Sequence, residues 1–421
     1  MATRRQFLRK ATMGAALAPF ALDPIISPWA LPAGSAPDWV EEARAQIPAS
    51  REPFFQTAGI APSPTPVMDA VAEMLHYQNK GPVSPEIYPQ VAATEPDLRT
   101  HLGQMFGASA DEVALTHSTS EGINIASWSR NWESGDEVII SNQEHPANTI
   151  PWYNLSTRFG VSVKRIDLST GTNLMDEMRA AVTSRTRMVS IPHVSRNNGR
   201  RLSDSESAEL AHWLRERDIR YHLDGAQGPG CVPFNFAELG SDYYSACGHK
   251  WLLGPKGTGA FFCRSDVLDR THMTWTGSHS TTSYDAVGKY ELIPETRRFE
   301  FGTRALATFH GFNAALNWVE GIGLSRILSR VDELTLYATE AWKNRGHEVS
   351  SPQTAQARSG VFVLRLPEDL SGRAVYDHLR ENKSTYTSPV DGPRDLRVAI
   401  HFFNTKEEID ATFDAIEHMG E

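Results

Sequence analysis

The chain has 421 residues, of which 40% are hydrophobic and 22% are charged, as in ordinary soluble globular proteins with one large and one smaller domain. Its formal net charge of −10 argues against a nucleic acid or an anionic membrane as partner, because both favour a basic surface. The three cysteines, an odd and small number, do not indicate a disulfide framework.

Residues 1–36 are predicted to be a twin-arginine export signal that is removed from the mature protein. Arg4 and Arg5 stand together before an apolar run over residues 11–22, an arrangement that resembles this signal. The run is too short to span a membrane. We therefore expect the twin-arginine export machinery to carry the folded chain to the periplasm, with no stable membrane anchor. The alternative is a basic N-terminus before a short buried helix.

The next segments predict an α/β fold. Residues 37–95, rich in proline, are expected to form an N-terminal arm that packs with the small domain. From about residue 111 to 262, short apolar segments alternate with amphipathic ones, and a large domain is expected over residues 96–325. The segments that read as strands are EVALTH, DEVIIS, VSVKRID, RMVSIPH, IRYHLD, DYYSAC and TGAFFC. Alternating strands and helices indicate a mostly parallel sheet covered on both faces.

The pattern changes after Phe299. Two long helices are predicted up to about residue 345, and they are followed by the strands GVFVLRL and LRVAI, each with a helix after it. These elements predict a small C-terminal α+β domain over residues 326–421.

Ligands on parallel sheets bind at the carboxyl ends of strands, so the residues after each strand are the candidates for a site. STSEGIN follows the first strand, and there Thr119 and Ser120 suit either a bound phosphate or simple capping of a helix. His145 follows the second strand and is either structural or part of the site.

Asp224 and Gln227 follow the fifth strand, and His249 and Lys250 follow the sixth. A buried carboxylate costs free energy unless it pairs with a cation. Lys250 alone could be a surface charge, a phosphate clamp or a nucleophilic amine. A phosphate cradle, an imidazole, a carboxylate and a lysine together fit pyridoxal 5'-phosphate (PLP), to which the lysine would form a Schiff base. No Walker loop or Gly-x-Gly-x-x-Gly element favours a nucleotide, and no metal site is expected.

In order and spacing, these motifs resemble the class V aminotransferases of PLP fold type I, which include isopenicillin N epimerase-like proteins and cysteine desulfurases. The similarity extends from FFQTAGIAPSPTPVMDAV to LRVAIHFFNTKEEIDATFDAI. It implies PLP as cofactor, a mostly parallel seven-stranded sheet in the large domain, and a homodimer with sites at the subunit interface.

The resemblance also implies a role for each site residue. Lys250 would hold the cofactor and shuttle protons, Asp224 would pair with the pyridinium nitrogen, and His145 would stack on the ring. Arg397 would hold the substrate α-carboxylate. The other contacts to the cofactor would come from His249, Cys247, Thr119 and Ser120 at the phosphate, Gln227 at the ring hydroxyl, and Gly302 and Thr303 of the partner subunit at the phosphate.

Two positions depart from the family pattern. Cysteine desulfurases need a nucleophilic cysteine on the loop before the arginine that corresponds to Arg397, and here this loop reads STYTSPVDGPRD. We therefore reject desulfurase activity, although not the fold. Arg196, followed by Asn197 in HVSRNNG, stands where many relatives carry an asparagine that faces the substrate. Arg196 either recognises a second acidic group or lies on the surface.

The sequence thus predicts a PLP-dependent enzyme that acts at the α-carbon of an amino acid or of a compound containing one. The first reading is a periplasmic class V aminotransferase. Epimerisation and loss of a β-substituent, as in a C–S lyase, share its first steps and stay open. Further alternatives are an enzyme that tailors siderophore peptides, by analogy, and a binding protein that kept the fold without the chemistry. The retained lysine, aspartate, histidine and arginine argue against the binding protein.

Overall fold

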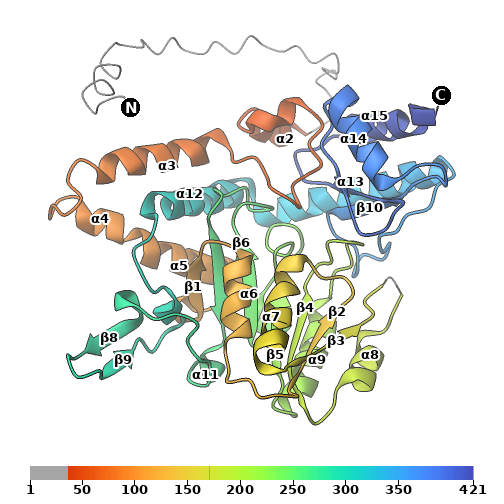
Figure 1. Ribbon diagram of the computed structural model, residues 1–421. Helices are drawn as coiled ribbons and strands as arrows, with labels where there is room; N and C mark the ends of the chain where they lie inside the picture. The colour runs from red at the N-terminus through yellow and green to blue at the C-terminus, as the bar shows by residue number, and fades with distance from the viewer. Residues whose placement is uncertain (1–36, 170, 421) are drawn as a thin grey trace, which may run out of the picture. The chain divides into compact units, whose positions relative to one another are not determined.

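A seven-stranded sheet forms the centre of the fold in the computed structural model, which describes residues 37–169 and 171–420 (Figure 1). The export signal expected over residues 1–36 lies outside the described residues. Along the sheet the strand order is β1-β7-β6-β5-β4-β2-β3, and only β7 runs antiparallel to its neighbours. The strands are β1 Val113–Thr116, β2 Glu137–Ser141, β3 Ser162–Ile166, β4 Thr186–Pro192, β5 Arg220–Asp224, β6 Tyr243–Cys247 and β7 Gly259–Cys263. The predicted α/β fold with a mostly parallel sheet is confirmed.

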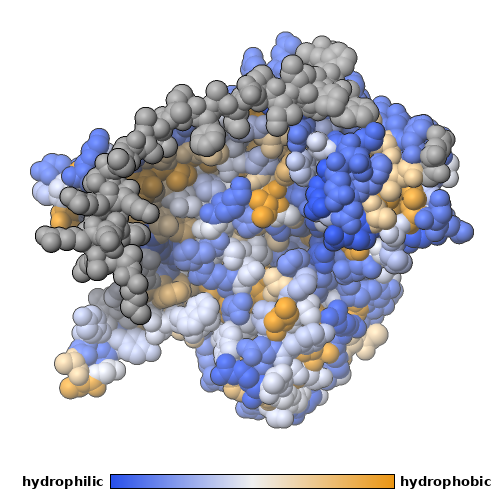
Figure 2. All heavy atoms as spheres, turned by 45° about the horizontal axis from the view of Figure 1, so that its top comes forward, coloured by the Kyte–Doolittle hydropathy of each residue, from blue (hydrophilic) through white to orange (hydrophobic). Residues whose placement is uncertain are grey.

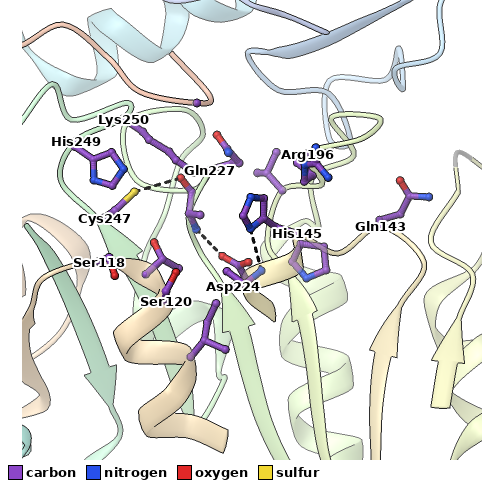
Figure 3. A pocket seen from close by; sticks show the side chains of 17 residues that line it. Ser118, Ser120, Gln143, His145, Arg196, Asp224, Gln227, Cys247, His249 and Lys250 are labelled. Atoms are coloured by element: carbon purple, nitrogen blue, oxygen red, sulfur yellow. Dashed lines mark hydrogen bonds between the residues drawn. The ribbon is translucent and has the colours of Figure 1, made fainter. Parts of the chain in front are cut away.

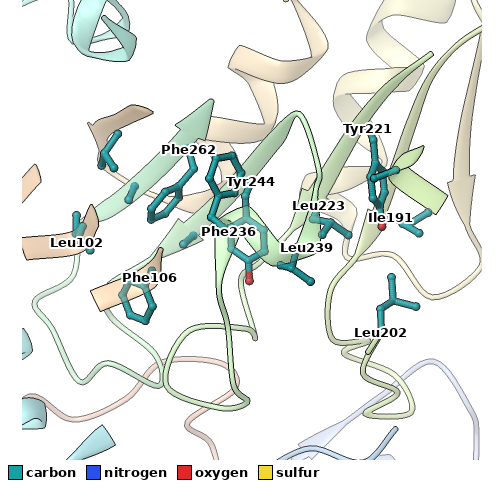
Figure 4. Close-up of a cluster of buried hydrophobic side chains, with 14 of the residues drawn as sticks. Leu102, Phe106, Ile191, Leu202, Tyr221, Leu223, Phe236, Leu239, Tyr244 and Phe262 are labelled. Carbon is teal, nitrogen blue, oxygen red and sulfur yellow. The ribbon is translucent and has the colours of Figure 1, made fainter. Parts of the chain in front are cut away.

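Helices cover both faces of this sheet. Side chains alternate between the faces along a strand, so Tyr243 and Phe261 pack toward α6 and α7, whereas Tyr244 and Phe262 pack toward α5, α9 and α10. Figure 4 shows the second of these apolar clusters. The helices around the sheet are α5 Thr94–Phe106, α6 Thr119–Ser127, α7 Ile150–Phe159, α8 Leu174–Ala181, α9 Asp204–Arg215, α10 Phe236–Leu239 and α11 Ser265–Leu268.

The N-terminal segment folds into short helices that reach two parts of the molecule. They are α2 Asp38–Arg44, α3 Thr65–Gln78 and α4 Tyr88–Ala92. In α2, Arg44 pairs with Glu408 at 2.8 Å and Trp39 stacks on Phe402, so this helix packs on the C-terminal part. Helix α3 lies against α12 Leu306–Ile322.

The C-terminal part is built on a second, antiparallel sheet of order β10-β12-β11. Its elements are α13 Leu324–Asn344, β10 Val361–Arg365, α14 Gly372–Lys383, β11 Ser388–Pro389, β12 Asp395–Ala399 and α15 Lys406–Glu417. Trp342, Phe362, Val398 and Phe413 belong to its apolar core. The strands and helices predicted for this α+β part agree with those observed, whereas the exact domain boundaries stay predictions.

A hairpin of β8 Thr281–Tyr284 and β9 Tyr290–Leu292 projects from the chain between β7 and α12 (Figure 1). It was not predicted. Short 3-10 helices link other elements, over Pro48–Arg51, Ala110–Glu112, Pro146–Asn148, Ser278–Ser280, Thr296–Phe299 and His418–Gly420. Over residues 37–169 and 171–420, no helix has the length and apolarity to cross a bilayer.

Candidate active site

A cavity opens at the carboxyl ends of the parallel strands, where the sequence predicted a site (Figure 3). The loops after β1, β2, β4, β5 and β6 all contribute to it. The predicted site residues that line it are Thr119, Ser120, His145, Arg196, Asp224, Gln227, Cys247, His249 and Lys250. Parallel strands therefore bring together side chains that lie up to 131 positions apart, because their carboxyl ends share one edge of the sheet.

The turn from β1 into α6 supplies the first wall. Ser118 caps the helix by accepting a hydrogen bond from the Glu121 N–H at 3.4 Å. Thr119 Oγ1 is buried without a hydrogen-bond partner. Capping is thus performed by Ser118, and Thr119 remains available to a ligand at a helix N-terminus, where the helix dipole favours an anion.

The loop after β6 holds Lys250 in a fixed frame. Backbone hydrogen bonds close the loop on itself, from Leu253 N–H to Lys250 C=O at 3.0 Å and from Gly254 N–H to Gly248 C=O at 2.8 Å. The next residue, Trp251, is 1% exposed and anchors the loop in the core. Lys250 therefore faces the cavity from a rigid support, and the surface-charge interpretation of this lysine does not hold (Figure 3).

Asp224 ends β5 beneath the same cavity. Its side chain is 5% exposed and accepts a hydrogen bond from the Ala226 N–H at 2.9 Å. Burial raises the pKa of Asp224, against the opposing effects of this hydrogen bond and of the Lys250 charge. Within the described residues it forms no ion pair, so a cationic partner has to come from a ligand.

Both histidines of the site are held neutral. Burial, followed by the charges of Lys250, Arg196 and Arg397, lowers the pKa of His145 to about 4. His145 Nδ1 accepts a hydrogen bond from the Ala147 N–H at 3.1 Å, which places the ring proton on Nε2. Burial and the nearby lysine charges lower the pKa of His249 to about 4 as well, and His249 Nδ1 is buried without a hydrogen-bond partner.

The unpartnered groups fit PLP. Thr119 Oγ1 and His249 Nδ1 lie unpaired beside the N-terminus of α6 and can bind the phosphate. Asp224 is a buried carboxylate in need of a cation, which a protonated ring nitrogen supplies. Lys250 offers an amine to the aldehyde. Each charged or polar part of the cofactor thus has a matching group in one cavity.

Gln227 and Cys247 also line the cavity, and both form hydrogen bonds to other residues of the chain. The Gln227 amide donates to the Ala58 C=O at 2.8 Å and accepts from Trp251 Nε1 at 2.7 Å, which leaves one N–H for a ligand. Cys247 Sγ lies 3.8 Å from the Ala226 C=O, and burial raises the pKa of this thiol. Cys247 is therefore a neutral thiol and not a nucleophilic thiolate.

Arg397, on β12, is a buried guanidinium whose charge and N–H groups have few partners in the chain. It is 5% exposed, its single hydrogen bond goes to Gln56 Oε1 at 3.5 Å, and its Nε has no partner. Burial and the charge of Arg196 lower the pKa of Arg397 to about 10. Arg196 lines the cavity, and both Arg196 and Asn197 contact Asp391, at 3.4 and 2.9 Å. An anion at Arg397 would complete this arrangement.

Gly302 and Thr303 are not brought to the cavity within this chain. Thr303 is exposed just before α12, and a Cβ added at Gly302 would meet open space. The segment is anchored nearby by Glu300, which pairs with Arg99 at 2.8 Å and accepts from the Leu115 N–H at 2.7 Å. The expected contact of this segment with a partner subunit's phosphate stays a prediction.

Sequence reasoning missed three residues at or beside the site. Gln143 and Gly59 line the cavity, and Gln56 contacts Arg397. Gln143 stands two positions before His145, so its place after β2 was a usable signal. Gln56 and Gly59 come from the N-terminal segment, where nothing local marks them as site residues.

Comparisons with known proteins show the family and the fold of the chain. The sequence family described as "Aminotransferase class-V" matches residues 54–412. A probable cysteine desulfurase of Methanothermobacter thermautotrophicus is 27% identical over 90% of this chain and 98% of its own length. Two solved structures of C-DES share the fold at 24% identity. One, a mutant with glycine covalently linked to its PLP cofactor, has a TM-score of 0.82 and covers 89% of this chain and 99% of C-DES. The other, described as a cystine C–S lyase with its product cysteine persulfide, has a TM-score of 0.80, with 87% and 97% covered.

Proposed function

The chain belongs to the class V aminotransferase family, whose enzymes depend on PLP, and we propose that it acts at the α-carbon of an amino acid or of a compound containing one. One observation carries this proposal. Lys250, Asp224 and neutral His145 share a cavity near Arg397, a buried guanidinium that lacks an anion. An amine, a carboxylate, an imidazole and an open carboxylate site form a suitable set for this chemistry.

When bound, the cofactor supplies an aldehyde for the amine and a ring that stabilises negative charge at the α-carbon. The residues of this chain do the rest. Arg397 binds the α-carboxylate and fixes the orientation of the α-hydrogen. The Lys250 amine, held by its closed loop, takes the α-proton and returns it as general base and acid. Asp224 holds the proton of the ring nitrogen in place, and the buried walls exclude water.

The principal reaction that we propose is transamination in the periplasm. A second candidate, loss of a β-substituent as in a C–S lyase, is supported by the names of the relatives. Desulfurase chemistry needs a cysteine on the loop over residues 384–395, and this loop has no cysteine. The chain's three cysteines are all buried. Elimination of a β-substituent needs no protein thiol, so it stands beside transamination.

The test follows α-protons in deuterated water with a panel of amino acids and the PLP-loaded protein. The proposal expects deuterium at the α-carbon with the wild type and none with Lys250→Ala, whereas the exposed control Lys343→Ala exchanges normally. Equal exchange by Lys250→Ala and the wild type would overturn the proposal. The products then separate the reactions: amino transfer to a second 2-oxo acid identifies transamination, and release of ammonia with the β-substituent identifies elimination.

Export and assembly complete the proposal. The paired Arg4 and Arg5 support export of the folded, cofactor-loaded chain by the twin-arginine machinery. Replacement of both by lysine should stop accumulation in the periplasm, and undiminished accumulation would contradict the signal. A homodimer is supported by the segment of Gly302 and Thr303, where Thr303 is exposed and a Cβ added at Gly302 would meet open space.

A further inference from the structure

We propose that Arg196 and Asn197 form a second anion subsite, and that the substrate is an α-amino acid whose side chain carries a carboxylate. That distal carboxylate displaces Asp391 from Arg196 while the α-carboxylate binds Arg397. The inference rests on the proposed function for its substrate, and it adds the class of side chain.

The charges of the two arginines act on the same site residue, His145. Arg196 lines the cavity, and its charge acts on both His145 and Arg397. Burial first, then the charges of Lys250 and both arginines, lower the pKa of His145 to about 4, and the charge of Asp391 opposes this shift. Among the described residues, the only carboxylate that contacts either guanidinium is Asp391. The described residues thus hold two guanidinium groups near His145, with a single carboxylate, that of Asp391, on Arg196 and none on Arg397.

Asp391 shows what Arg196 and Asn197 bind. Its Oδ1 accepts from Arg196 Nη1 at 3.4 Å, and its Oδ2 accepts from Asn197 Nδ2 at 2.9 Å. The two donors therefore hold the two oxygens of a single carboxylate. Arg196 and Asn197 are adjacent on the loop after β4, and Asp391 reaches them from the loop between β11 and β12. A carboxylate is a ligand of the right geometry for this pair.

The chain's own carboxylate is a weak occupant. The Asp391 side chain is 66% exposed, and that of Arg196 is 20% exposed. Exposed ion pairs contribute little to stability, because water competes with them and salt screens them. A substrate carboxylate on the cavity side of Arg196 would meet this guanidinium with less water around it. Replacement of the Asp391 carboxylate on Arg196 by a substrate carboxylate therefore costs little free energy. The substrate gains a charge-assisted hydrogen bond from the guanidinium.

The charge of the site favours an acidic side chain. Arg196 and Arg397 are cations, whereas both histidines are neutral. The buried Asp224 is matched to the cofactor ring and sits beneath the cavity. A substrate with a basic side chain would add a cation to this set, whereas a distal carboxylate would neutralise one. Of the two readings of Arg196 that the sequence left open, the geometry points to recognition of a second acidic group.

Binding of non-reactive dicarboxylates tests the subsite without catalysis. Calorimetry with the PLP-loaded protein compares succinate and glutarate with their monoamides. The wild type should bind one of the diacids about 10- to 100-fold more tightly than its monoamide, the range of a hydrogen bond to a charged group. Arg196→Gln should bring this ratio close to one, and Asp391→Asn should raise it by removing the competing carboxylate. Arg179→Gln, an exposed arginine on α8, is the matched control and should keep the wild-type ratio.

A wild-type ratio near one for both diacids, or a ratio unchanged by Arg196→Gln, overturns the subsite. The α-proton exchange assay is run in parallel with glutamate and aspartate against glutamine and asparagine. The acidic pair should exchange faster, and Arg196→Gln should remove the advantage. If diacid binding depends on Arg196 but no amino acid exchanges its α-proton, the subsite is supported and the proposed function is contradicted. The two failures are therefore distinguishable.

Discussion

At the scale of single residues, the site is defined by buried polar groups that the chain itself leaves unpaired. In the part of the chain that the structure describes, Asp224 has no cationic partner, and neither His249 Nδ1 nor Arg397 Nε has a hydrogen-bond partner. An unsatisfied buried group costs about 1–3 kcal/mol, and a charged one costs more. Asp224 and His249 line one cavity and Arg397 lies near it, so a cofactor and a substrate of complementary charge would relieve their cost together.

Asp224 is the residue whose charge matters most for the ring. Replacement by alanine or by the isosteric asparagine should slow α-proton exchange about 100-fold or more, which corresponds to about 2.7 kcal/mol of barrier. The physical reason is loss of the carboxylate that keeps the ring nitrogen protonated. Exchange rates in deuterated water, measured at saturating PLP, check this. Near-normal rates in Asp224→Asn would show that shape, not charge, is what the position needs.

At the scale of elements, the phosphate cradle depends on how closely α6 approaches β6. Gly122 in α6 faces Ser245 in β6, and a Cβ added there would come within 2.6 Å of Ser245 Oγ. A glycine in a helix interior costs about 0.5–1 kcal/mol relative to alanine. The close approach accounts for glycine at this position, because it lets the N-terminus of α6 sit against the sheet at the edge of the cavity.

Two glycine substitutions separate the effect of the close approach from the effect of glycine on helix stability. Gly122→Ala should lower the free energy of unfolding by about 1–3 kcal/mol, since overpacking forces α6 away from the sheet, and should weaken retention of PLP. Gly321→Ala, in α12 with open space around it, should instead raise the free energy of unfolding by up to about 1 kcal/mol. Urea titrations of both variants provide the measurement. A stabilised Gly122→Ala with unchanged PLP retention would refute the tight contact.

Most strands and several site residues could be predicted from the sequence, whereas the hairpin and the contacts between distant loops could not. Most strands of the large sheet were predictable because they are short apolar runs, buried on both faces and bounded by turns; the edge strand β3 is the exception, since only Ile166 of it is buried. Lys250, Asp224 and His145 were predictable because they lie at the carboxyl end of a strand or within a few residues of it. The β8–β9 hairpin was not, because its exposed polar strands carry no burial pattern. Contacts such as Arg397 with Gln56, 341 positions apart, could not be predicted because no local signal records which loops meet.

At the scale of the whole molecule, exposed apolar side chains support the homodimer that we propose. Tyr284 and Val287 of the hairpin are 79% and 84% exposed, and Val83, after α3, is 89% exposed. Figure 2 shows apolar colour at the free end of the hairpin. Isolated surface apolar residues are ordinary, but a projecting hairpin with an apolar tip is a suitable dimer contact.

Sedimentation should find the wild type as a dimer. The paired change Tyr284→Asp and Val287→Asp should weaken the dimer at least tenfold, because it places two charges where an apolar contact is expected. Leu336→Asp, at an exposed apolar position of α13, is the control for added charge. A monomeric wild type, or a dimer that withstands the paired change as well as the control, would contradict this surface.

The assignment of Lys250 as the cofactor-bearing lysine underlies all of this chemistry. Borohydride reduction of the PLP-loaded protein, followed by peptide mass spectrometry, reports the lysine to which the cofactor is attached. The account predicts the pyridoxyl group on Lys250 in the wild type and no modified peptide in Lys250→Arg. Attachment to another lysine, such as the nearby Lys256, or no attachment at saturating PLP would contradict it.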